Sequence, residues 1–161
     1  MIELVLAGKK DAARAQAPGA EAAEIAALPA FSIIDLDGKK ISREDLAGRV
    51  VLVEFWATWC PPCRGTLGWL GELKKRHGDR IAVMTIAVES DEAQVRKPAA
   101  ELRLPFYWTM GTADLAGSFG DVGGLPTLFV FDRTGRTQGM FFGAPPDLHA
   151  RAEASVAGLL K

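Results

Sequence analysis

The chain carries its only two cysteines, Cys60 and Cys63, within residues 55–65, which read FWATWCPPCRG. Two thiols at this spacing could form a structural disulfide, supply half of a metal site, or act as a redox pair that opens and closes. A structural disulfide explains little, because a chain of 161 residues can bury a sufficient core without one. The loop would also be very short, and the stabilisation from a disulfide grows with loop length.

A metal site needs more ligands than the sequence offers. Zinc sites usually combine two CxxC pairs, or one pair with histidines. The histidines are His77 and His149, at no helpful spacing, and Arg64 stands where covalent haem attachment would need a histidine. We therefore predict a redox-active pair and no metal.

Sequence patterns place the pair where a strand becomes a helix. Residues 49–58 form a near-continuous apolar run, which is typical of a strand buried on both faces. From Pro61 onward leucines recur at helical spacing, up to a stop signal at His77-Gly78. The cysteines then lie one helical turn apart on one face, within reach of a disulfide after a small adjustment.

A position at the start of a helix favours a reactive thiolate at Cys60. Free N–H groups and the positive end of the helix dipole stabilise a thiolate, and cysteines at such positions have pKa values lowered to roughly 3.5–7.5. The thiolate is the attacking species in disulfide exchange. Cys63, deeper in the helix, would stay a thiol until it resolves a mixed disulfide. Pro61 and Pro62 fit the first turn, where a missing N–H costs little.

The rest of the chain predicts an α/β domain. The remaining elements, in chain order, are a β-hairpin at 31–42 with an Asp37-Gly38 turn, a buried strand at 80–89, a helix at 91–103 that breaks or restarts at Pro98, a short helix at 113–120, antiparallel strands at 127–132 and 137–142, and a helix at 146–161. We predict three layers around a mixed central sheet. Residues 1–28 are interpreted as an N-terminal arm or linker, and residues 29–161 as the domain.

The composition and the first residues of the chain limit the classes of partner and the cellular compartments that we expect. A net charge of −1 leaves no basic excess for phosphates, so we expect no nucleic-acid partner. No apolar run reaches the length of a membrane span. The first residues do not read as a signal peptide, because Glu3 interrupts a short apolar stretch and lysines follow it. The protein is therefore either cytoplasmic or exported by a signal absent from this sequence.

Residues 50–64, VVLVEFWATWCPPCR, resemble the active-site segment of TlpA/ResA-like thiol–disulfide oxidoreductases of the thioredoxin superfamily. Residues 31–42 (FSIIDLDGKKIS) and 123–136 (GGLPTLFVFDRTGR) extend the resemblance to most of the chain. It implies a thioredoxin-like α/β/α fold with a mixed central sheet and an added N-terminal hairpin. It also implies an enzyme that acts on protein disulfides, most often as a reductase, and that needs no separable cofactor.

The resemblance carries expectations about the setting. Members of this group usually work outside the cytoplasm, for example in cytochrome c maturation, and take electrons from a membrane thiol carrier. We therefore expect a periplasmic or other extracytoplasmic protein, with a cytoplasmic location as the alternative. We also expect protein thiols or disulfides as substrates, and a monomer.

The resemblance also assigns roles around the dithiol. It makes Cys60 the nucleophile and Cys63 the resolving thiol. Leu125-Pro126 would be a cis-proline peptide that faces the pair and lines the substrate groove.

A docking surface is expected beside the pair. Trp59, Pro61 and Pro62 would contact the substrate there, whereas Trp56 is expected in the core.

Glu54 is the only charged residue between Val50 and Trp59. A carboxyl group in a buried strand should stay largely protonated at neutral pH. Thioredoxins carry a buried acid at the equivalent position, where it exchanges protons with the resolving cysteine. We predict the same role for Glu54, as a general base toward Cys63 through water. The alternative is that Glu54 reaches the sheet edge or pairs with a basic residue.

The chain departs from the family pattern within the helix that follows the pair. Thr66 and Gly68 stand where relatives commonly have an acid and a proline. Gly65, Gly68 and Gly71 recur at a spacing of three. We expect this stripe to allow close packing against the sheet, ahead of forming a groove for a partner.

Two other functions stay open at this point. Thiol peroxidases share the wider fold group, but they need the pattern P-x-x-x-T-x-x-C, and Ala57 stands in place of its threonine. A non-enzymatic module that binds a metal or a partner is the other alternative.

Overall fold

The structure is a computed structural model that describes residues 25–161. Its elements are β1 (Ser32–Ile34), β2 (Lys40–Ser42), α3 (Arg43–Leu46), β3 (Val50–Trp56), α4 (Pro61–His77), the 3-10 turn η1 (Gly78–Arg80), β4 (Ile81–Ala87), α5 (Glu92–Leu102), β5 (Tyr107–Met110), α6 (Ala113–Ser118), β6 (Thr127–Phe131), β7 (Thr137–Phe142) and α7 (Leu148–Leu159). Most of the predicted arm at 1–28 lies outside the described residues, and the boundary after residue 28 stays a prediction.

A five-stranded mixed sheet forms the centre of the molecule, with the strand order β5-β4-β3-β6-β7. Strand β3 pairs in parallel with β4 and antiparallel with β6, and β7 pairs antiparallel with β6. The predicted parallel pair and the antiparallel C-terminal strands are therefore confirmed. The predicted N-terminal hairpin is also confirmed, as a separate two-stranded sheet whose turn has Gly38 at a φ of 80°.

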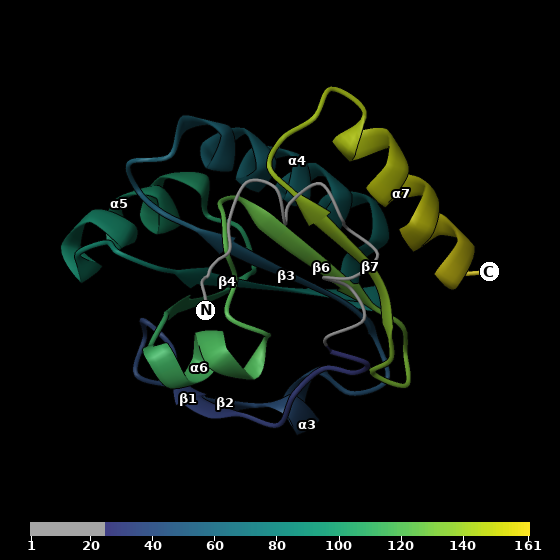
Figure 1. The fold of residues 1–161 in the computed structure, drawn as a ribbon, viewed down its shortest axis with the longest axis horizontal. Coiled ribbons are helices and arrows are strands. Elements are labelled where there is room, and N and C mark those ends of the chain that lie inside the picture. Colours follow the sequence, from purple (N-terminus) through teal and green to yellow (C-terminus); the bar gives the residue numbers. More distant parts are fainter. Residues whose placement is uncertain (1–24) are drawn as a thin grey trace, which may run out of the picture.

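Helices cover both faces of the sheet, which confirms the three-layer prediction (Figure 1). Helices α4, α5 and α7 lie on one face, and α3, α6 and the β1–β2 hairpin lie on the other. The side chains of β3 alternate between the two cores. Val50, Leu52 and Trp56 join the core under α4, while Val51, Val53 and Phe55 join the core over α6. All seven residues of β3 are buried, so the strand is fixed in the middle of the molecule.

The region after β4 differs from the prediction in two ways. Helix α5 runs unbroken through Pro98, so the expected break is wrong. Pro98 and Val95 are the buried residues of this helix, and their packing offsets the hydrogen bond that proline cannot donate. Strand β5 was not predicted at all. Its four residues are too few to show a period, and they pair with β4 at the edge of the sheet.

The glycine stripe on α4 does not pack as expected. A Cβ at Gly71 would lie 2.7 Å from Leu104 Cδ1, so this glycine allows a close approach, although to a loop residue and not to a strand. Gly65 and Gly68 are exposed, and a Cβ on either would meet nothing within 4 Å. For these two positions the prediction of packing against the sheet is wrong.

In the part of the chain that the structure describes, every helix is too short or too polar to cross a bilayer.

Candidate active site around Cys60 and Cys63

The two cysteines form a disulfide at the N-terminus of α4, with their Cα atoms 5.4 Å apart. Cys60 is the N-cap residue of the helix, and Pro61 and Pro62 occupy its first positions. The N–H of Cys63 donates to the carbonyl of Cys60 at 3.1 Å, so the first turn is already closed around the pair. The predicted position at the junction of strand and helix is confirmed.

Burial separates the two cysteines. Cys60 keeps 6% of its surface exposed, whereas Cys63 is fully buried. A protein substrate can therefore reach only Cys60 from outside, and Cys63 can react only with a sulfur that is already held at Cys60.

The first turn of α4 contains no acidic residue, while its last turn contains four basic or imidazole side chains. The positive end of the helix dipole at Cys60 is therefore not offset by a local carboxylate. At the position where relatives carry an acid, Thr66 is buried and its hydroxyl donates to the carbonyl of Pro62 at 3.2 Å. This threonine stabilises the first turn and adds no charge.

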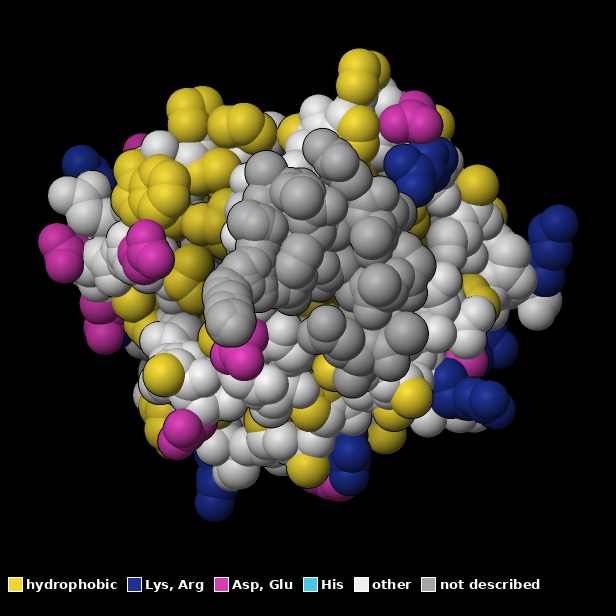
Figure 2. All heavy atoms as spheres, viewed as in Figure 1, with side chains coloured by type: hydrophobic (Ala, Val, Ile, Leu, Met, Phe, Trp, Pro, Cys, Tyr) yellow, Lys and Arg dark blue, Asp and Glu magenta, His cyan; other side chains and the backbone are white. Residues whose placement is uncertain are grey.

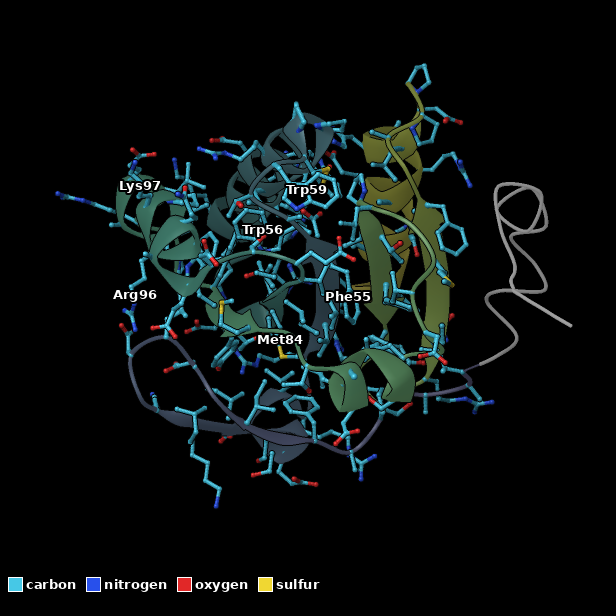
Figure 3. All side chains as sticks on the ribbon, turned by 60° about the vertical axis from the view of Figure 1, so that its left-hand side comes forward. Phe55, Trp56, Trp59, Met84, Arg96 and Lys97 are labelled. Carbon is cyan, nitrogen blue, oxygen red and sulfur yellow. A yellow bond between two sulfur atoms is a disulfide. The ribbon has the colours of Figure 1, made fainter. Side chains whose placement is uncertain are left out.

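Trp59 projects from the loop before Cys60, with 59% of its surface exposed. Its indole N–H donates to the backbone carbonyl of Glu89 at 2.9 Å. The same loop is held by Ser90, whose Oγ accepts from the N–H of Thr58 at 3.0 Å. Trp59 is therefore an exposed side chain in a fixed orientation (Figure 3). Trp56 is fully buried, as predicted.

A mainly apolar groove of about 560 Å³ begins at Cys60. Four of the five residues predicted to contact the substrate line it, namely Trp59, Pro61, Pro62 and Leu125. The fifth, Pro126, is buried and does not belong to the lining, although the Leu125–Pro126 peptide bond is cis as the resemblance implied. Figure 2 shows hydrophobic side chains gathered at the upper left, where the chain enters α4 in Figure 1.

The sequence did not identify the remaining residues of the groove, which are Phe55, Val88, Glu89, Ala116, Val122, Gly123 and Gly124. Residues 122–124 directly precede Leu125, so the predicted cis-proline could have indicated them. The others come from β3, from the loop after β4 and from α6, and only the tertiary fold brings them to the cysteines.

Glu54 lies on the face of β3 that α4 covers, because its position alternates with Val53 and Phe55 of the opposite core. It is fully buried, and neither carboxyl oxygen has a hydrogen-bond partner among the described residues. Burial raises the pKa of this carboxyl well above 4.5. The alternatives of a position at the sheet edge or an ion pair with a described basic residue are therefore wrong.

Two more buried polar atoms without a described partner lie on this face. They are the hydroxyl of Thr85, which is next to Glu54 in the β3–β4 register, and the indole N–H of Trp56. Buried polar groups are normally satisfied by protein or by internal water. The face of the sheet beneath α4 thus holds polar groups that could bind water near Glu54.

Within residues 25–161, no three His, Cys, Asp or Glu side chains come together as a metal-binding cluster. His149 instead stacks on Trp69, with ring centroids 4.5 Å apart.

Comparisons with known proteins decide the family. The model of the redoxin family matches residues 23–158. The chain belongs to the redoxin family. Thiol-disulfide oxidoreductase ResA from Bacillus cereus is 35% identical over 112 residues, which cover 67% of this chain and 63% of that protein. Thioredoxin-like protein YneN from Bacillus subtilis is 34% identical over 118 residues, which cover 71% of this chain and 69% of that protein.

Solved structures agree with this relationship. A thiol:disulfide interchange protein of the thioredoxin family from Chlorobium tepidum has a TM-score of 0.76 and 30% identity, and the match covers 84% of this chain and 97% of that one. The predicted thioredoxin-like fold and the resemblance to ResA-like oxidoreductases are confirmed. The ResA relative and the Chlorobium tepidum protein bear names of the enzyme class that the sequence predicts. The chain spans about 63% of the length of the ResA relative, so the activity, substrates and partners of the whole protein are taken up below as proposals.

The raised pKa of Glu54 predicts a dependence of stability on pH. The folded protein holds a proton that the unfolded chain loses above about pH 4.5, so the free energy of unfolding declines as the pH rises from there through the folded pKa. The slope within this window approaches about 1.4 kcal/mol per pH unit. The Glu54→Gln variant has no titratable group at this position. We expect the variant to gain stability relative to the parent as the pH rises.

Urea unfolding of both proteins at several pH values from 5 to 8, with the disulfide intact, measures this difference. Glu44→Gln changes an exposed carboxylate and serves as the control. A Glu54→Gln difference that stays constant across this range would show that Glu54 is ionised normally in the folded protein.

Proposed function

We propose that this protein is a thiol–disulfide oxidoreductase that reduces disulfides in other proteins. The observation that carries the proposal is the Cys60–Cys63 pair at a helix N-terminus, where Cys60 is the one cysteine of the pair that keeps some exposed surface and it lines an apolar groove. Its ResA relative and the Chlorobium tepidum structure bear names of the same chemistry.

The reaction begins with the reduced dithiol. The Cys60 thiolate attacks one sulfur of a substrate disulfide, so a Cys60–substrate bond forms while the substrate S–S bond breaks, and the leaving sulfur takes up a proton. Cys63 then loses its proton and attacks the sulfur of Cys60. The Cys60–Cys63 disulfide forms and the second substrate thiol departs. Two electrons pass from the protein to the substrate, and a dithiol donor must restore the reduced pair.

The groove holds the substrate chain beside Cys60. The apolar contact surface comes from Trp59, Pro61, Pro62 and Leu125. Pro126 does not line the groove, but its cis peptide bond fixes the backbone of Leu125. Few polar groups line this surface, which suits many substrate sequences.

Glu54 acts as the proton acceptor for Cys63. The two residues belong to the same layer, because Cys63 packs in the core under α4 and Glu54 lies on the strand face that this core covers. A water molecule held by Glu54 and Thr85 would connect the carboxyl to the thiol. Since burial keeps the carboxyl protonated in the resting protein, it must lose its proton before it can serve as a base.

The setting of the reaction is also part of the proposal. We infer a reductase outside the cytoplasm that takes electrons from a membrane thiol donor, works as a monomer and uses no cofactor beyond its own dithiol. Cytochrome c maturation is one process that needs such a reductase. The names of the relatives support the chemistry, whereas these finer points rest on the resemblance of residues 50–64 and 123–136.

Replacing the resolving thiol should trap the intermediate. Cys63→Ser, reacted in its reduced form with insulin, is expected to accumulate a covalent complex that resists detergent and disappears on addition of dithiothreitol. Its mass identifies the mixed disulfide at Cys60. Cys60→Ser is the matched control and should form little complex, because Cys63 is buried. The parent protein should speed insulin reduction by dithiothreitol. A parent without this effect, or equal trapping by both variants, would contradict the assigned roles.

Removing the carboxyl of Glu54 should slow only the second step. In single-turnover reactions, Glu54→Gln is expected to release the substrate at least about tenfold more slowly than the parent, since a general base typically contributes a hundredfold or more when it acts directly. The attack by Cys60 should keep its rate. Stopped-flow measurements from pH 5 to 9 separate the two steps, with Glu44→Gln as the control. An unchanged pH profile of the release step ends the proposal for Glu54.

A further inference from the structure

A second hollow of about 790 Å³ lies beside Trp59, between the start of α4, the loop after β4 and helix α5. Trp59 and Glu89 line both this hollow and the apolar groove, so they form the ridge between the two. We propose that this hollow is a subsite for a basic side chain of the protein substrate, next to the substrate cysteine. The proposal deepens, and rests on, the proposed reductase function.

The lining of the hollow is charged. It contains three carboxylates, Glu89, Asp91 and Glu101, and two cations, Arg64 and Lys97. Within the described part of the chain, none of these five side chains takes part in an ion pair. The excess of one carboxylate favours a cationic ligand.

Charges of both signs lie at the end of the hollow nearest the cysteines, because the cation Arg64 directly follows Cys63 on α4 and the carboxylate Glu89 borders both hollows. Glu89 and Asp91 belong to the loop whose carbonyl holds the Trp59 indole, and Glu89 also borders the groove that begins at Cys60. Lys97 follows Asp91 by six residues along α5, more than one helical turn further from the loop. A basic group that crosses Trp59 therefore comes beside Glu89, with Asp91 two residues further along the same loop.

Arg96 and Lys97 are neighbours on α5, but their side chains point in different directions. Arg96 pairs with Glu92 at 2.7 Å and donates to the carbonyl of Leu36, so it turns toward the hairpin loop. Figure 3 shows Arg96 and Lys97 leaving α5 in different directions, with Trp59 on the same upper side of the molecule as Lys97. In Figure 2, acidic side chains border the hydrophobic ones at the upper left.

Trp59 provides an independent reason for a cation. Its indole is 59% exposed and held by one hydrogen bond, so it offers a fixed aromatic surface on the ridge. Cations are attracted to the face of an indole, and the aliphatic stem of a lysine or arginine packs on apolar surface while its charge stays in water. A basic substrate residue can thus pack on Trp59 and place its charge near Glu89 and Asp91. An acidic residue would gain neither interaction.

An extended substrate can occupy both hollows at once. Successive residues of a strand advance about 3.3 Å and alternate in direction. With the substrate cysteine at Cys60, residues on one side lie in the apolar groove and the neighbour on the other side crosses Trp59. The protein should therefore prefer cysteines that have an apolar residue on one side and a lysine or arginine on the other.

Matched peptides test this preference. Each carries one cysteine in a mixed disulfide with 2-mercaptoethanol, and the residue beside the cysteine is Lys, Gln or Glu, placed after it in one set and before it in a second set. The second-order rate constant for reduction by the pre-reduced protein is measured by chromatography of the released peptide. In one set, we expect the Lys peptide to react about fivefold faster than the Glu peptide, as exposed ion pairs allow. The ratio should fall toward one at about 0.5 M salt.

The double variant Glu89→Gln/Asp91→Asn should abolish the preference. The indole of Trp59 bonds to the backbone of residue 89, which this change retains, and asparagine remains a good N-cap for α5 at position 91. The double variant Glu44→Gln/Asp79→Asn removes the same charge from exposed positions outside both hollows and should keep the preference.

Bis(2-hydroxyethyl) disulfide separates failure of this subsite from failure of the reductase function. It is small and uncharged, so the parent and the Glu44/Asp79 control variant should reduce it at equal rates. If it and the Gln peptides are reduced but the Lys and Glu peptides react alike in both sets, or the Glu89/Asp91 variant keeps the parent's ratio, the subsite is contradicted. If the parent reduces none of the probes, the proposed function itself fails.

Discussion

The N-terminus of α4 rests on the C-terminal end of the central strand β3, and the whole site depends on this junction. Strand β3 is buried along its full length and paired on both sides, so its end is fixed in space. The three residues after Ala57 turn the chain directly into the helix. This turn puts Cys60 at the positive end of a helix of 17 residues, with Cys63 one turn inside the core.

Glu54 is an energetically unfavourable residue at its buried position in β3. A carboxyl group without a described partner in a strand of apolar residues costs free energy, and burial keeps it protonated. Leucine or valine would stabilise the strand better. A buried polar group that breaks the packing rules on the strand face beneath α4 is the pattern expected where stability yields to function. The hydroxyl of Thr85, opposite Glu54 in the β3–β4 register, is a second buried polar group without a described partner.

The two hollows beside Trp59 divide the work of recognition between different forces. In the proposed function, the apolar groove would give contact area to almost any unfolded chain, whereas the charged hollow would discriminate between sequences. Because surface ion pairs are weak and screened by salt, the second hollow changes rates between substrates without binding any of them tightly. Weak binding suits an oxidoreductase, because the enzyme must release each product before the next reaction.

Local patterns in the sequence predicted those parts of the fold that a short stretch of residues determines by itself. The apolar run of β3, the leucine spacing of α4 and the two cysteines between them located the reactive pair correctly. Other features depend on tertiary contacts. Strand β5 has four residues and takes its structure from β4, and Pro98 stays helical because the core covers it. The cis bond before Pro126 was predicted only through resemblance, since X–Pro bonds are cis in about 5–6% of cases. The exposed surface of Gly65 and Gly68 and the position of Ala116 of α6 in the groove had no local signal in the sequence.

The most direct test of the account measures the reactivity of Cys60 against pH. In reduced Cys63→Ser, where Cys60 is the single thiol, the rate of alkylation by iodoacetamide follows the thiolate fraction. The account predicts a half-maximal rate well below about pH 8.5, the value for a free thiol, because the start of α4 stabilises the negative sulfur. A midpoint at or above pH 8.5 would contradict it and leave the pair without an activated nucleophile.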